Sequence, residues 1–180
     1  LLDYISGLTS KHMKFFNGNS LVYIMQGLPI LSTATGKDIL NLIFGVKEKR
    51  NISLIGLKDN LHKNEFSQMQ GLWNKAFHKM SLGQKRWLVV TSFMLIKSDV
   101  YILDEPTSGI DREGTESLLL KIDKKRKEGA TIIMTTHEEQ DIEYFKDAWI
   151  VHLSKKNVDF NGNATEFEEK FSKNENEGSK

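Results

Sequence analysis

The chain has 180 residues, with 25 Lys and Arg against 24 Asp and Glu, and its net charge of +1 gives no sign of a strongly charged surface for nucleic acid or anionic lipid. A composition of 39% hydrophobic and 27% charged residues is typical of a folded globular chain. The absence of Cys excludes disulfides and a thiolate nucleophile, and the longest apolar run, 87–96, is too short to span a membrane.

Apolar runs of strand length alternate with helical periodicities along the chain. In chain order the pattern predicts a helix from Leu1 to about Gly7, a strand at 21–25, helices at 37–44, 65–79 and 83–96, a strand at 100–103, a helix at 113–128, a strand at 130–136, a helix at 138–145, strands at 148–153 and 157–160, and a last helix at 166–171. This alternation favours an α/β fold with a mostly parallel sheet flanked by helices. We expect one domain over 1–171, with 30–96 as a helical insert and 172–180 as a disordered tail.

The only Gly-Lys pair, Gly36-Lys37, does not form a phosphate-binding loop. That loop reads G-x-x-x-x-G-K-[ST], whereas Leu31 and Asp38 occupy its first and last fixed positions here. The pattern instead predicts that Thr35 caps a helix, with Asp38 favourable in its first turn.

Polar side chains follow three of the predicted strands. Gln26 ends the strand at 21–25, Asp104 and Glu105 end the strand at 100–103, and His137 follows the strand at 130–136. If these strands are parallel neighbours, all four side chains meet on one rim, where open sheets bind ligands. Two adjacent carboxylates suit a metal–nucleotide site, although Asp-Glu-Pro alone could simply begin a turn.

A second candidate lies at the start of the helix at 83–96. Ser81 can cap this helix, Gly83 lets a ligand approach the backbone, and the free N–H groups favour an anion. The alternative is an ordinary capped helix. Lys85 and Arg86, however, carry the wrong charge for a helix N-terminus unless a negative or polar group lies nearby.

Together these segments resemble the nucleotide-binding domain of ABC transporters. VYIMQ resembles the strand before the Q-loop, SLGQKR the signature motif LSGGQ, VYILDEP the Walker B strand with its catalytic Glu, SGID the D-loop and TTH the switch His. TGKDILNLIFG resembles the helical-subdomain segment of exporter-type members. The order and spacing agree from about residue 1 to 170, and the resemblance implies a P-loop NTPase-type fold. Leu82 stands where the commonest signature has Gly.

The family's Walker A loop is missing from this sequence. LLDYISGL resembles the helix that directly follows that loop, so we expect the sequence to begin just after it. The chain as given is therefore expected to bind ATP poorly and not to hydrolyse it.

The resemblance implies ATP and Mg²⁺ as cofactors and assigns roles to the residues named above. Asp104 and Gln26 would help to hold Mg²⁺ and the attacking water, Glu105 would polarise that water, and His137 would contact the γ-phosphate. The residues that would meet the nucleotide held by a partner subunit are Ser81, Leu82, Gly83, Gln84 and, in the D-loop, Asp111.

The resemblance also implies partners. Two such domains would pair head to tail, as a homodimer or heterodimer, and drive transmembrane permease subunits through the helical insert. This predicts an ATPase, exporter-like, that lies peripherally on the cytoplasmic face of the cell membrane, with no nucleic-acid partner. Two alternatives remain open: a soluble ABC-type ATPase acting on ribosomes or nucleic acid, and a non-hydrolysing relic. A multi-span membrane protein encoded next door would favour transport.

Overall fold

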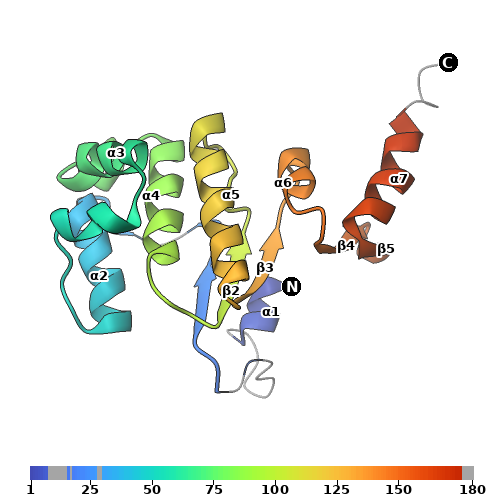
Figure 1. The fold of residues 1–180 in the computed structure, drawn as a ribbon, viewed down its shortest axis with the longest axis horizontal. Helices are drawn as coiled ribbons and strands as arrows, with labels where there is room; N and C mark the ends of the chain where they lie inside the picture. The colour runs from blue at the N-terminus through green and yellow to red at the C-terminus, as the bar shows by residue number, and fades with distance from the viewer. Residues whose placement is uncertain (8–15, 17, 28–29, 176–180) are drawn as a thin grey trace. The chain divides into compact units, whose positions relative to one another are not determined.

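The computed structural model describes residues 1–7, 16, 18–27 and 30–175 (Figure 1). The chain divides into two compact units, Leu1–Thr136 and His137–Lys180. Each unit is described by itself below. The single domain over 1–171 that the sequence predicts stays a prediction.

The first unit is built on a three-stranded parallel sheet. Its strands follow the order β1-β2-β3, with bounds β1 (Leu21–Ile24), β2 (Val100–Asp104) and β3 (Thr131–Thr135). Ile24 pairs with Leu103, and Asp104 pairs with Thr135. The residues of β2 before Asp104 are buried, as expected for a central strand covered on both faces. The parallel sheet predicted from the sequence is therefore confirmed.

Helices cover both faces of this sheet. On one face, Leu2 and Ile5 of α1 (Leu2–Ser6) pack with Val100 and Ile102. The other residues of β2 alternate to the opposite face, where the Tyr101 hydroxyl donates to the carbonyl of Ile96 just after α4 (Leu82–Met94). Helix α5 (Arg112–Lys127) lies beside α4 and precedes β3 (Figure 1).

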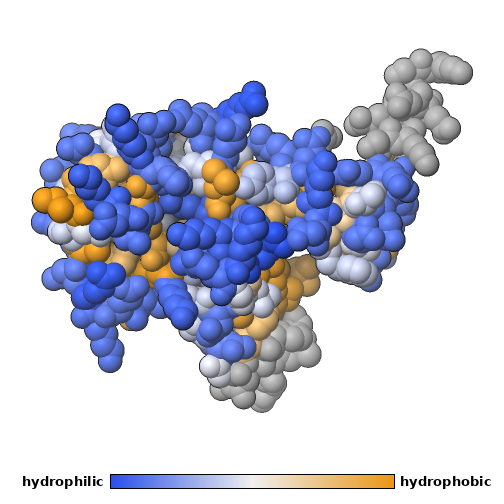
Figure 2. Space-filling view, viewed as in Figure 1, coloured by the Kyte–Doolittle hydropathy of each residue, from blue (hydrophilic) through white to orange (hydrophobic). Residues whose placement is uncertain are grey.

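The segment between β1 and β2 is helical in its described residues. It contains α2 (Gly36–Glu48), the 3₁₀ turn η1 (Ile55–Asn60), α3 (Lys63–Trp73), the 3₁₀ turn η2 (Phe77–Lys79) and α4. In Figure 1, α2 lies on the side of α4 away from α5, whereas α3 contacts α2, α4 and α5. Across unit 1 the visible surface is largely hydrophilic, with separate apolar patches over this helical segment (Figure 2).

Several helix ends differ from the sequence prediction, and two of them show why. Helix α2 continues through Gly45, where a side chain would meet open space, and ends at Lys49 in a left-handed conformation with φ 55°. Helix α3 ends at Trp73 rather than Lys79, and the chain then re-forms a turn as η2. Among the described residues, no helix is long and apolar enough to cross a membrane.

A buried carboxylate joins α3 to α5. Lys121 Nζ lies 2.8 Å from Glu65 Oε2, the Ser117 hydroxyl donates to Glu65 Oε1, and the His62 N–H donates to Oε2 at 2.8 Å. Burial alone would raise the pKa of Glu65, but the hydrogen bonds from Lys121, Ser117 and His62 outweigh it and lower that pKa.

Glu65→Gln is expected to lower the free energy of unfolding by about 2 kcal/mol at neutral pH, because it removes the charge that these donors stabilise. A carboxylate whose pKa is lowered by folding contributes stability above its ordinary pKa of 4.5, and this is lost as pH falls through the folded value. Urea unfolding from pH 7 to pH 3 should therefore show the two proteins converging in acid. The exposed Glu116→Gln serves as control, and a difference that grows in acid would contradict the prediction.

The second unit contains a helix, a hairpin and a final helix. Its elements are α6 (Glu139–Tyr144), β4 (Trp149–Ser154), β5 (Asn157–Asn163) and α7 (Ala164–Glu175). The antiparallel strands are joined at Lys155 and Lys156, whose positive φ values of 47° and 68° fit a tight hairpin turn.

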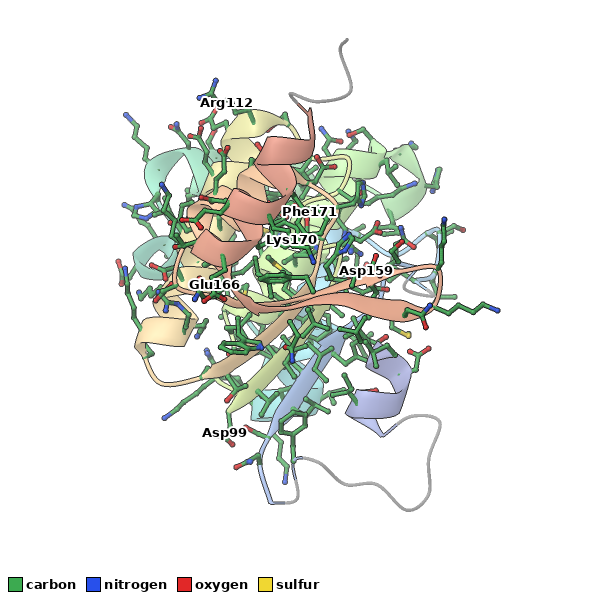
Figure 3. The ribbon with its side chains drawn as sticks, turned by 90° about the vertical axis from the view of Figure 1, so that its right-hand side faces the viewer. Asp99, Arg112, Asp159, Glu166, Lys170 and Phe171 are labelled. Carbon is green, nitrogen blue, oxygen red and sulfur yellow. The ribbon has the colours of Figure 1, made fainter. Side chains whose placement is uncertain are left out.

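Helix α7 packs on the hairpin through aromatic side chains. Phe167 lies 5.4 Å from Phe160 between ring centroids, and Lys170 donates to the Asp159 carbonyl at 2.9 Å (Figure 3). These contacts fix the helix, which extends to Glu175 and so includes the first residues of the expected tail. The rest of that tail, 176–180, lies outside the described residues.

Candidate functional site

The ends of β1 and β2 bring together an amide and a carboxylate. Gln26 and Glu105 each follow the end of their strand, and the pairing of Ile24 with Leu103 places them side by side. Gln26 Nε2 donates to Glu105 Oε2 at 2.7 Å. The sequence prediction that these two side chains share a rim is supported by this contact.

Asp104 faces the neighbouring strand on the other side. Its Oδ1 accepts a hydrogen bond from the Thr135 hydroxyl at 2.7 Å, at the end of β3. The Glu105 N–H donates to the Thr135 carbonyl at 3.1 Å. The two adjacent carboxylates therefore have different partners.

The backbone of Glu105 is left-handed, with φ 48°. This conformation is uncommon for a residue with a side chain and costs about 1–2 kcal/mol. The Gln26 side chain and the Thr135 carbonyl hold Glu105 from two strands, so its carboxylate is fixed where the chain leaves the sheet. Strained backbone of this kind is concentrated at functional sites.

A buried arginine lies directly beneath these side chains. Arg86, on the second turn of α4, is 9% exposed and donates to the carbonyls of Met25, Gln26, Asp104 and Glu105. Burial lowers the pKa of Arg86, while the nearby charges of Asp104 and Glu105 raise it. The sequence indicated that Arg86 needs a polar neighbour, and these carbonyls supply it, but it did not identify them.

The first turn of α4 is capped and tightly packed. Ser81 Oγ accepts from the Gln84 N–H at 3.2 Å, and Gln84 Oε1 accepts from the Ser81 N–H at 3.2 Å and from Lys75 Nζ at 2.9 Å. A Cβ on Gly83 would lie 2.6 Å from the carbonyl oxygen of Gly109. Gly83 therefore lets α4 begin directly against the loop that follows β2.

The other residues expected near a partner's nucleotide lie at the same end of α4 and α5. The Leu82 side chain is 74% exposed. Asp111 Oδ1 accepts from the Gly114 N–H at 2.8 Å and so caps α5. This cap gives Asp111 a structural role that the sequence analysis did not assign.

Both the sequence and the fold are similar to those of known proteins. A family model described as "AAA domain, putative AbiEii toxin, Type IV TA system" matches residues 29–140. The energy-coupling factor transporter ATP-binding protein EcfA2 of Streptococcus sanguinis is 31% identical over 104 residues, which cover 58% of this chain and 36% of that protein. EcfA of Methanocaldococcus jannaschii is 33% identical over 79 residues, 44% of this chain and 28% of that protein.

Two solved structures show the same fold. An archaeal ribosome recycling factor, aABCE1, in complex with the ribosomal stalk protein aP1, superposes with a TM-score of 0.66 at 19% identity and covers 87% of this chain and 30% of that chain. A dimeric ATP-binding cassette in a post-hydrolysis state bound to ADP and Pi gives a TM-score of 0.62 at 14% identity, with 81% and 63% coverage. The chain belongs to the AAA-domain family that the matching family model describes, and ABC-type ATP-binding proteins are among the proteins it resembles in sequence and in fold.

The chain spans only part of the length of the curated relatives that it matches. The matched segments cover 28% to 36% of the two curated relatives. The segments that resemble the Q-loop strand and the Walker B strand pair in parallel and end beside each other, where Gln26 donates to Glu105.

His137 is the remaining residue that the sequence predicts for the site. It is the first residue of the second unit, and its Nε2 lies 3.3 Å from Glu138 Oε1. Its ring is exposed. The structure therefore joins the side chains of Gln26 and Glu105 and directs Asp104 to Thr135, while the position of His137 beside them stays a prediction.

The side chains of Asp104 and Gln26 suit Mg²⁺ that is bound together with a nucleotide. Within the described residues, no group of three or more His, Asp or Glu side chains could hold a metal. Mg²⁺ keeps several waters and takes one or two carboxylates together with substrate phosphates, so Asp104 with the Gln26 amide is a suitable protein share.

Gly36 and Lys37 belong to a capped helix, as predicted. Thr35 Oγ1 accepts from the Asp38 N–H at 3.3 Å, and Asp38 Oδ2 accepts from the Thr35 N–H at 2.9 Å. A Cβ on Gly36 would lie 2.5 Å from the Leu72 carbonyl, so this glycine serves the packing of α2 on α3.

Thr35→Ala is expected to lower the free energy of unfolding by about 1 kcal/mol, because the N-cap of α2 is lost. Lys37→Met should leave ATP affinity unchanged, because Lys37 is outside the rim formed by Gln26 and Glu105. Urea unfolding and nucleotide titration of the full-length gene product measure the two effects. A large loss of ATP affinity in Lys37→Met would show that Gly36 and Lys37 belong to the phosphate-binding site after all.

Proposed function

We propose that the full-length gene product hydrolyses Mg·ATP in a head-to-tail dimer and couples hydrolysis to transport by membrane-spanning permease subunits. The observation that carries this proposal is the 2.7 Å hydrogen bond from Gln26 to the left-handed Glu105 at adjacent ends of parallel strands. This contact supports a site in which a polar amide and a candidate base act at the rim where parallel sheets bind nucleotides.

The residues of this chain would act mainly by positioning and by charge. Glu105 would accept the proton of the attacking water, and Gln26 would orient both the carboxylate and that water. Asp104, held by Thr135, would face the metal. Mg²⁺, when bound, neutralises charge that develops on the phosphates.

The start of α4 would serve the nucleotide of a partner subunit. Ser81, Gly83 and Gln84 lie in its first turn, where backbone N–H groups and the helix dipole attract an anion. Leu82 and Asp111 flank this turn, and His137 would reach the γ-phosphate of the nucleotide bound in its own subunit. The dimeric cassette among the solved structures has the same fold, which is consistent with such pairing.

Transport is proposed from the relatives, which are named as ATP-binding proteins of energy-coupling factor transporters. The full-length protein would lie on the cytoplasmic face of the membrane, held there by its permease partners. The net charge of +1 gives no support for a strong overall attraction to nucleic acid. We therefore favour a transport ATPase over one that acts on ribosomes or DNA.

Asp104→Asn tests the metal assignment. It is expected to raise the KM for Mg·ATP about 10-fold, because one charged ligand of the metal is lost, a cost of about 1.4 kcal/mol. ATP hydrolysis by the full-length protein at several Mg²⁺ concentrations measures this effect, and EDTA should abolish activity in the parent. Asp59→Asn, at an exposed site, is the control. Hydrolysis that persists in EDTA, or an unchanged KM in Asp104→Asn, would contradict the assignment.

A further inference from the structure

We infer that Arg86 is a positioning residue of the hydrolytic site, which fixes Glu105 and Gln26 by holding the backbone on which both stand. The inference deepens the proposed function and rests on it. Its basis is the set of carbonyl hydrogen bonds that one buried guanidinium makes at the ends of two neighbouring strands.

The hydrogen bonds of Arg86 reach two carbonyls at each of the two strand ends. On the β1 side, Nη1 donates to the Met25 carbonyl at 3.0 Å and to the Gln26 carbonyl at 3.2 Å. On the β2 side, Nη2 donates to the Glu105 carbonyl at 2.6 Å and to the Asp104 carbonyl, and Nε donates to the Glu105 carbonyl at 3.2 Å. Arg86 thus ties together the two segments that carry the proposed amide and base.

Most of these carbonyls lie beyond the regular strands. β1 ends at Ile24 and β2 ends at Asp104, so the carbonyls of Met25, Gln26 and Glu105 fall where the parallel ladder stops. Each of these carbonyls needs a donor from outside the ladder, and here the donor is Arg86. The guanidinium therefore replaces strand pairing at the point where the chain turns away from the sheet.

Lysine could not replace this group. A guanidinium presents five N–H donors in one plane, whereas an ammonium is a compact charge with three. The carbonyls of two strands lie around one plane of donors here, and a single ammonium could serve only some of them. The left-handed backbone at Glu105 would then lose the hydrogen bonds to its own carbonyl oxygen.

The position of Arg86 in the sequence gives this contact a further meaning. It lies two residues after Gln84, on the helix whose first turn meets the loop at Gly109. A displacement of the start of α4 would be transmitted through Arg86 to Glu105. The same helix therefore links the surface proposed to meet a partner's nucleotide with the carboxylate proposed to act on the chain's own nucleotide.

The first test is kinetic and uses Arg86→Lys in the full-length gene product. We expect kcat to fall about 10- to 100-fold while KM for Mg·ATP changes little, because a misplaced group slows the chemical step more than it weakens binding. The matched control is Arg112→Lys, since Arg112 projects into solvent from the start of α5 with a side chain that is 90% exposed (Figure 3). Equal effects on kcat and KM would assign Arg86 a general structural role and overturn the inference.

A double-mutant cycle identifies the residue through which Arg86 acts. If Arg86 works by placing Glu105, single-turnover hydrolysis in Glu105→Gln should be slowed little further by adding Arg86→Lys. If the two losses multiply, Arg86 does not act through Glu105 and the inference fails.

Amide hydrogen exchange tests the same contact without any nucleotide. In Arg86→Lys, exchange at residues 25–26 and 104–105 should become faster, while exchange in the helical segment 63–73 stays as in the parent. Unchanged exchange at the strand ends, or faster exchange throughout, would overturn the inference. The two proposals can also fail separately. If the parent protein does not hydrolyse ATP but Arg86→Lys still shows this local change, the proposed function is wrong and the positioning of the strand ends by Arg86 still holds.

Discussion

Glu105→Gln in the full-length gene product is expected to slow ATP hydrolysis by about 10²–10⁴-fold and to leave ATP affinity nearly unchanged. The amide keeps the size of the side chain and can still accept the hydrogen bond that Gln26 donates to Oε2 at 2.7 Å. It cannot accept a proton from the attacking water. A steady-state assay beside nucleotide titration measures the two quantities.

The same variant reports on the assembly. With hydrolysis blocked, Mg·ATP should remain between two subunits, and the dimer should persist in size-exclusion chromatography. Glu116→Gln, at a carboxylate that is 62% exposed on α5, is the control and should behave as the parent does. Hydrolysis by Glu105→Gln at the parent rate would remove Glu105 as the base. An inactive variant that stays monomeric would indicate a partner of different sequence.

Gly83→Ala is expected to reduce hydrolysis at least 100-fold and to lower the free energy of unfolding by about 1–3 kcal/mol. The added Cβ would lie 2.6 Å from the Gly109 carbonyl, so either the start of α4 or the loop after β2 must move. Gly83→Asp should abolish activity, because it also places a carboxylate beside the amides that would receive a phosphate. Hydrolysis assays and urea unfolding of each variant measure both losses.

Gly71→Ala provides the comparison for this prediction. A Cβ there meets open space on α3, so the change should slightly stabilise the protein and leave activity intact. Leu82→Gly should be mild, because the Leu82 side chain is 74% exposed. Full activity in Gly83→Ala would show that the loop at Gly109 can move away from the added Cβ without loss of function, and that Gly83 does not constrain the site.

The sheet and its helices could be predicted because their signals are local. The run Val100–Leu103 is apolar without interruption, and its neighbours on either side in the sheet are similar runs that each precede a polar residue. The ends of the helices were harder to predict from the sequence. Gly45 predicts the end of a helix, yet α2 continues through it. The position of Gly45 has no neighbour within 4 Å of an added Cβ, and Lys49 adopts the left-handed conformation at the end of the helix.

The site was only partly accessible from the sequence. The carboxylates and the amide could be placed on one rim because parallel strands share the direction in which they end. The contacts of Arg86 with four carbonyls could not be predicted, because they depend on the depth at which α4 packs under the strand ends. The role of Asp111 as the cap of α5 had a signal in the sequence, since Asp is a favoured N-cap residue three positions before Gly114.

The left-handed backbone at Glu105 makes the identity of this residue informative across evolution. A chain with no use for the carboxylate would gain about 1 kcal/mol by drifting to Gly, which adopts φ 48° without strain. Val and Ile would be excluded there whatever the selection on catalysis, because β-branched side chains tolerate this conformation least. Among close homologues, retention of Glu at 105 would thus mark lineages in which hydrolysis is still under selection, and Gly would mark those that have lost it.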